Sequence, residues 1–148
     1  MDPFVAPVPL ELNHVQVIVR AMVRVAESDG RHQEELVLIR EFYEACRADL
    51  NGLADFQDLV KQPFDPAEAR EILDTPILKE TLLKSCYLVA YADGQLSAQE
   101  KAAIAKVVSE VGIDAELASR SEELVRDYLL RQLARTDVAS IRKVASEL

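Results

Sequence analysis

Two Asp-Gly dipeptides, each followed by a glutamate, contain the residues of this chain that could do chemistry. The four acids are Asp29, Glu35, Asp93 and Glu100. Carboxylate and carbonyl oxygens are the ligands that hard divalent cations such as Ca²⁺ or Mg²⁺ prefer. If the two turns pack against each other, we expect the four carboxylates and nearby backbone carbonyls to form one cation site.

A purely structural role is also available to every residue of the two motifs. A glycine can stop a helix in the left-handed conformation, and Ser97 with Glu100 has the spacing of a capping box. An EF-hand is excluded, because the twelfth residue counted from Asp93 is Ile104 and not a glutamate. The sequence therefore leaves open whether these acids are metal ligands or only helix caps.

The other candidate reactive residues lack the partners that their chemistry needs. Glu11 and His14 have the spacing used in di-iron bundles, but the only other histidine, His32, belongs to no second Glu-x-x-His motif. Cys46 and Cys86 stand singly in apolar helical patterns, which favours neither a zinc knuckle nor a reactive thiol. All four glycines also stand singly, so there is no phosphate-binding loop. We therefore expect a protein that is not an enzyme.

Helices are the elements that must position the four acids. Apolar residues recur at spacings of three and four along most of the chain, with almost none of the alternation that is typical of strands. We predict six or seven helices, over about 13–27, 33–46, a short one from 66, a central apolar one from 76, then 98–111, 115–135 and a short terminal one from 137. Residues 1–11, which include three prolines, are expected to form an extended arm.

The two Asp-Gly units form an internal repeat, in which an apolar helix ends in Asp-Gly and an acidic helix follows. If the first spacer is one residue shorter, Glu35 pairs with Glu100 and Ile39 with Ile104, which keeps the core pattern in register. We therefore predict a compact all-α domain over 12–148. It would contain a pseudo-twofold helix-Asp-Gly-helix repeat over about 13–48 and 76–112.

The segment Val89-Ala-Tyr-Ala-Asp-Gly-Gln-Leu-Ser-Ala-Gln-Glu100 is similar to the signature of the tellurite-resistance TerB-like family. The first half keeps Asp-Gly and a downstream acid, but it has Ser28 before the aspartate and lacks the capping serine. The resemblance extends over roughly residues 12–135. It implies an all-α fold, a place in bacterial stress systems linked to tellurite and other chemical insults, and divalent-cation binding by the clustered acids. It implies no reaction.

The charge of the chain limits the partners that we expect. With 26 Asp and Glu against 17 Lys and Arg, the formal net charge is −9, which disfavours nucleic acids and anionic membranes and favours cations or basic partners. The N-terminus reads Met-Asp-Pro-Phe, unlike a signal peptide, and no apolar run is long enough to cross a membrane. We therefore expect a cytoplasmic protein with no membrane insertion.

Two hypotheses about function follow from these observations. In the first, the protein is a stress-response module that responds to a divalent cation, and carboxylates from both halves lie around one centre. In the second, it is a metal-independent helical module whose acidic or apolar surface docks a protein partner, and the turns lie apart. The identity of the ion, the partner and the oligomeric state are not determined by the sequence.

Overall fold

The computed structural model describes residues 10–28, 30, 33–49, 52, 55–91 and 96–135. These residues form seven helices and no strand. The helices are α1 (Leu12–Glu27), α2 (Gln33–Asp49), α3 (Phe56–Leu59), α4 (Pro66–Ile72), α5 (Pro76–Ala90), α6 (Ala98–Val111) and α7 (Ala115–Arg135). The all-α prediction is confirmed, although the single turn of α3 was not predicted. The expected terminal helix and most of the expected N-terminal arm lie outside the described residues.

Side-chain caps explain where four of the described helices begin. Oxygens of the capping side chains accept backbone N–H groups of the first turn at 2.8–3.2 Å, and the caps are Asp65, Thr75, Ser97 and Asp114. At the end of α6, Gly112 takes a φ of 77° and the Ile113 amide donates to the Val108 carbonyl, as in a Schellman motif. In the first turn of α4, the Glu68 carboxylate lies 3.8 Å from an Arg20 nitrogen.

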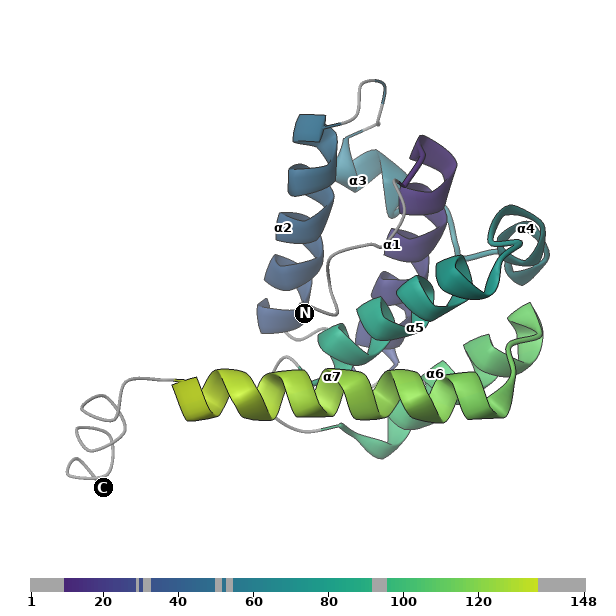
Figure 1. Ribbon diagram of the computed structural model, residues 1–148. Coiled ribbons are helices and arrows are strands. Elements are labelled where there is room, and N and C mark those ends of the chain that lie inside the picture. Colours follow the sequence, from purple (N-terminus) through teal and green to yellow (C-terminus); the bar gives the residue numbers. More distant parts are fainter. Residues whose placement is uncertain are drawn as a thin grey trace.

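Two helices, α1 and α5, form the centre of the described bundle. α1 packs against α2, α4, α5 and α6, whereas α5 packs against α1, α2, α6 and α7 (Figure 1). The interior residues of α1 that have no exposed surface are Val15, Ile18, Val19, Ala21, Met22, Val25 and Ala26. The prediction that the helix from residue 76 is central is therefore confirmed, and α1 shares that position.

The contacts between the two halves follow a reciprocal pattern. α1 contacts its own following helix α2 and also α6, and α5 contacts its own following helix α6 and also α2. A pseudo-twofold repeat predicts this exchange, because each first helix then packs against both second helices. The symmetry itself stays a prediction.

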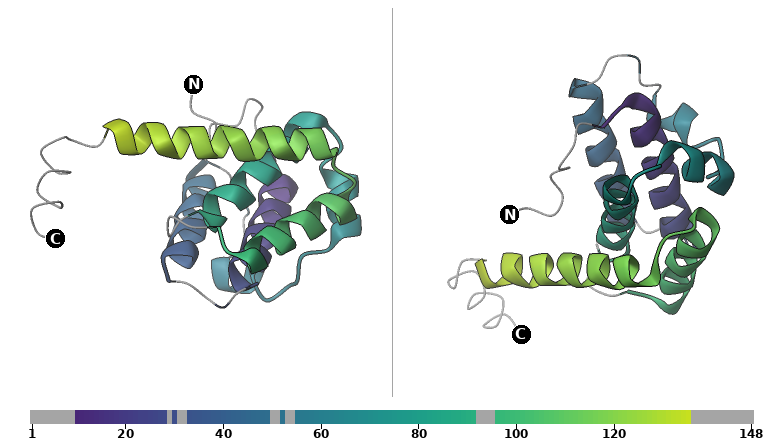
Figure 2. Two further views of the ribbon diagram at one scale, coloured as in Figure 1. Left: turned by 90° about the horizontal axis from the view of Figure 1, so that it is seen from below. Right: turned by 45° about the vertical axis from the view of Figure 1, so that its right-hand side comes forward.

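The long helix α7 lies across α5, and its C-terminal part projects beyond the other helices (Figures 1 and 2). Its inner face contains Ala118, Ser121 and Val125, which are all buried, whereas Leu130 is 57% exposed. The Tyr91 hydroxyl at the end of α5 donates to Glu122 at 3.2 Å and links the two helices. Within the described part of the chain, no helix has both the length and the apolar character needed to cross a membrane.

Candidate metal centre

Glu35 and Glu100 occupy equivalent positions in the two halves. Each is the third residue of its helix, α2 or α6, and neither side chain has any exposed surface. Ile39 and Ile104 follow one turn later and are also buried. The positive end of the helix dipole favours an acid in the first turn, which gives both glutamates a local electrostatic reason for their position.

The two carboxylate oxygens of Glu100 differ in their hydrogen bonds. Oε1 accepts the Ser97 N–H at 3.2 Å, and the Glu100 N–H donates to Ser97 Oγ at 3.0 Å, so the predicted capping box is formed. Oε2 is buried and has no hydrogen-bond partner among the described residues. Burying a charged oxygen without a partner is costly, and capping accounts for only one of the two oxygens.

The end of α1 shows the turn geometry that the sequence predicts for the first Asp-Gly. Gly30 has a φ of 103°, in the left-handed region that favours glycine, and its amide donates to the Glu27 carbonyl at 3.4 Å. Ser28 closes the last turn, since its hydroxyl donates to the Val25 carbonyl at 2.7 Å. This geometry agrees with the structural role of the glycine and does not test the role of the acid beside it.

Two of the four predicted ligands, Asp29 and Asp93, lie outside the described residues. The convergence of all four carboxylates around one centre therefore stays a prediction. Among the residues that are described, no three His, Cys, Asp or Glu side chains gather into a group that could hold a metal ion.

The other reactive side chains have structural roles. The Glu11 amide donates to His14 Nδ1 at 3.0 Å, so the Glu-x-x-His spacing serves the start of α1. Cys86 is fully buried, and its burial raises the pKa of the thiol to about 12, which keeps it in the unreactive neutral form. Cys46 is half-buried in α2.

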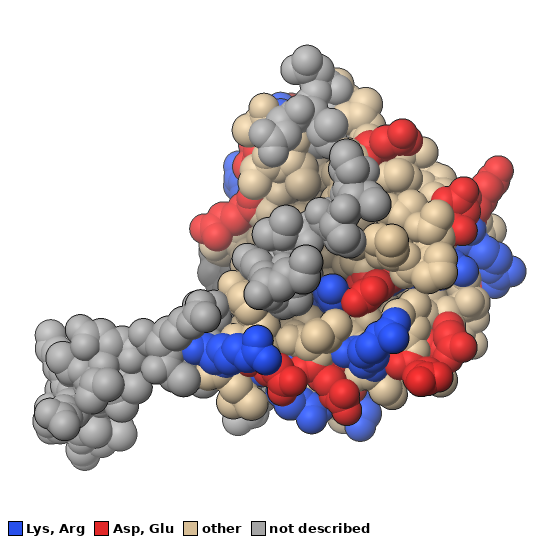
Figure 3. Space-filling view, in the orientation of Figure 1, with Lys and Arg blue, Asp and Glu red and all other residues tan. Residues whose placement is uncertain are grey.

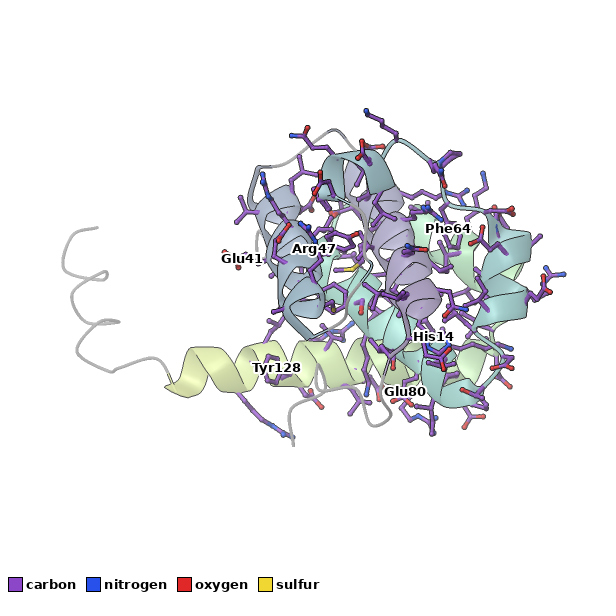
Figure 4. All side chains as sticks on the ribbon, turned by 90° about the horizontal axis from the view of Figure 1, so that it is seen from above. His14, Glu41, Arg47, Phe64, Glu80 and Tyr128 are labelled. Atoms are coloured by element: carbon purple, nitrogen blue, oxygen red, sulfur yellow. The ribbon has the colours of Figure 1, made fainter. Side chains whose placement is uncertain are left out.

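Sequence reasoning missed a groove of 590 Å³ beside the C-terminal half of α1. Arg24 donates to both carboxylate oxygens of Glu110 at 3.3 and 3.5 Å, and its guanidinium lies 5.7 Å from the centre of the Phe64 ring. Lys106 Nζ lies 3.7 Å from the same carboxylate. Figure 4 shows Phe64 beside α1, on the side away from Glu41 and Arg47 of α2. A pair of arginines four residues apart on a mostly apolar helix is the sequence feature that could have indicated this groove.

Charged side chains of both signs are interspersed on the face drawn in Figure 3. Among the described residues, some acids are neutralised by ion pairs within one helix, such as Arg126 with Glu122 at 2.9 Å and Lys84 with Glu80 at 3.0 Å. Over the described residues of that face, the net charge of −9 is therefore not gathered into one continuous acidic surface.

The family model described as Tellurite resistance protein TerB matches residues 34–123, which is more than half of the chain. The matched span includes Glu35, Asp93 and Glu100 and begins after Asp29. No curated protein and no solved structure matches the chain.

Proposed function

The chain belongs to the TerB family of tellurite-resistance proteins, and from this premise we propose that it is a non-catalytic cytoplasmic module of a bacterial stress response. In this proposal it binds a divalent cation, Ca²⁺ or Mg²⁺, through Asp29, Glu35, Asp93 and Glu100. The cation would join the two Asp-Gly turns, and the bound and free forms would be read by a protein partner in the same system.

The observation that carries the proposal is the buried Oε2 of Glu100, which has no hydrogen-bond partner among the described residues. A capping glutamate needs only one oxygen, and on an exposed helix end water would satisfy the other. A divalent cation would compensate a negative oxygen in the protein interior. Cation binding therefore accounts for the burial of Glu100 Oε2, whereas capping alone does not.

The position of Glu35 also supports cation binding. It is as fully buried as Glu100 and stands at the same place in its helix, as expected if each half supplies one interior carboxylate. Ca²⁺ takes six to eight oxygens and Mg²⁺ six, so two glutamates, two aspartates and backbone carbonyls at the ends of α1 and α5 are a suitable set.

Thermal unfolding of chelator-treated protein, with and without added Ca²⁺, Mg²⁺, Mn²⁺ or Zn²⁺, tests the proposal. A ligand at about 100 times its Kd adds roughly 2.7 kcal/mol to the free energy of unfolding. In a domain of this size that raises the midpoint by several degrees. We expect such a rise for one of the hard cations, and we expect Asp29→Asn with Asp93→Asn to abolish it.

Two substitutions at the start of α6 separate capping from cation binding. Ser97→Ala removes the cap and lowers stability by about 1 kcal/mol, but it leaves both Glu100 oxygens in place, so the cation-induced rise should persist. Glu100→Gln keeps a capping oxygen and removes the charge. It should raise the midpoint in chelator, because a buried amide costs less than an uncompensated carboxylate, and it should abolish the cation-induced rise.

No rise in the midpoint for any ion at millimolar concentration would contradict the cation proposal. The acids would then be turn and cap residues, and the metal-independent interaction module with an acidic docking surface would become the working function. The net charge of −9 supports that alternative, since it favours a basic partner.

A further inference from the structure

Two neighbouring grooves run along the outer side of α1. The first, of 590 Å³, lies between α1, the segment that joins α3 to α4, and α6. The second, of 390 Å³, lies between α1, α2 and α3. Both are lined by Val23, Glu27 and Val60, so the two grooves adjoin each other at these residues, and together we call them the basic trough.

The charge of the basic trough is opposite to that of the whole chain. Its lining contains four cations, Arg20, Arg24, Arg40 and Lys106, and two acids, Glu27 and Glu110. Glu68, whose carboxylate lies 3.8 Å from Arg20, is a third acid beside the trough. Four positive charges less these three negative charges leave +1, against −9 for the protein. Charge complementarity therefore selects an anionic ligand at this place, although the rest of the molecule repels one.

The trough already holds a carboxylate of the chain itself. Arg24 and Lys106 contact Glu110 at 3.3 to 3.7 Å, longer than the 2.7–2.9 Å usual for charge-assisted hydrogen bonds. The side chains of Arg24 and Glu110 are 27% and 28% exposed, so this pair is partly solvated and contributes little to stability. A second carboxylate beside Glu110 would be repelled by it, so an incoming carboxylate would replace Glu110 at these two cations rather than share them.

Arg20 adds positive charge one turn away on α1. Its terminal nitrogens face Gln62 at 2.7 Å and Glu68 at 3.8 Å. Its Nε is buried and has no hydrogen-bond partner among the described residues, and its side chain is only 12% exposed, so Arg20 acts on a ligand through its charge rather than through a free donor.

Apolar side chains line both grooves together with these charges. Phe64 and Val60 line the first groove, and Phe56, Leu36 and Val37 line the second, with Val37 45% exposed. A small anion would contact only the charged side chains. An extended peptide directs successive side chains to opposite sides, so its acidic side chains can face the cations while its apolar side chains face these apolar residues.

We propose that the basic trough binds a segment of a partner protein in which acidic and apolar side chains alternate. One carboxylate would lie between Arg24 and Lys106, and apolar side chains would pack against Phe64 and Val60. Neither Glu35 nor Glu100 lines the trough, so this inference does not depend on cation binding.

Fluorescence anisotropy with labelled short peptides tests the inference on the full chain. The probe is a peptide of alternating aspartate and leucine, compared with lysine-leucine and serine-leucine peptides of the same length. We expect only the acidic peptide to bind. Arg24→Gln with Lys106→Gln should weaken its binding by about tenfold or more, because charge-assisted hydrogen bonds are lost.

The matched control is Lys101→Gln with Arg131→Gln, which removes the same two charges from exposed positions outside the trough. This control should bind like the unmodified protein. Lys106→Gln alone serves as a second variant, since its 65% exposed side chain can change without affecting the fold.

Three results would overturn the inference. They are no binding of the acidic peptide, equal binding of all three peptides, and equal weakening in the control variant. If inorganic phosphate or succinate displaces the peptide at concentrations similar to the peptide's own Kd, the trough is a small-anion site and the peptide assignment is wrong.

Discussion

At the residue scale, two ionisable neighbours in α5 make the folded state sensitive to alkaline pH. Burial raises the pKa of Cys86 from its ordinary value of 9.0 to about 12. Burial, followed by the nearby carboxylate of Glu122, raises the pKa of Tyr87 from 10.0 to about 12. The unfolded chain therefore loses these protons first as the pH rises. The stability that the protonated Cys86 and Tyr87 side chains contribute is complete below about pH 9 and is lost as the pH approaches 12.

Tyr87→Phe should reduce this alkaline loss, because it removes one of the two buried groups that titrate. Two pKa units correspond to about 3 kcal/mol in the free energy of unfolding, and about half of this loss is reached at about pH 11, midway between the two pKa values. Urea unfolding at about pH 8 and about pH 11 would measure the difference, with Tyr128→Phe as a control at a partly exposed tyrosine. Equal losses of stability in the Tyr87 variant and the unmodified protein would contradict the prediction.

At the element scale, α7 is fixed to the bundle by its face against α5. Val125 has no exposed surface, whereas Leu130 on the same helix is 57% exposed. The two side chains are similar in chemistry and differ in environment. Comparing alanine substitutions at the two positions therefore distinguishes the effect of packing from that of helix propensity.

Val125→Ala should lower the free energy of unfolding by about 2 kcal/mol, through lost burial and the cavity left behind. Leu130→Ala should change it by less than about 0.5 kcal/mol, as surface substitutions usually do. Chemical denaturation of both variants provides the comparison. A larger effect at Leu130 than at Val125 would mean that the exposed face of α7 is covered in solution. It would contradict the packing of α7 on α5 through Val125.

At the scale of the whole molecule, a net charge of −9 repels itself when the chain is compact. Among the described residues, ion pairs such as Lys61 with Asp58 at 3.5 Å are exposed, and exposed pairs contribute only about 0–1 kcal/mol each. We therefore expect the unfolding midpoint to rise by a few degrees between about 0.02 and about 0.3 M NaCl, because salt screens the repulsion. Chelator in every sample excludes divalent ions. A falling midpoint would show that ion pairs such as Arg24 with Glu110 outweigh the repulsion.

The sequence by itself determined the local structure. Helical periodicity and the Ser97–Glu100 capping box depend on residues within one or two turns, and both predictions are confirmed over the described residues. The family could be recognised for a similar reason, since its motif lies within one short segment.

Only the tertiary structure decided which of these residues are interior and which distant ones meet. Periodicity places Glu100 in the first turn of α6, but its burial depends on how other helices, α1 and α5 among them, pack against α6. Arg24 and Glu110 are 86 positions apart, so no local pattern predicts their contact or the basic trough around them. Local structure depends on neighbouring residues, whereas burial and charge pairing arise when helices from both halves of the chain pack together.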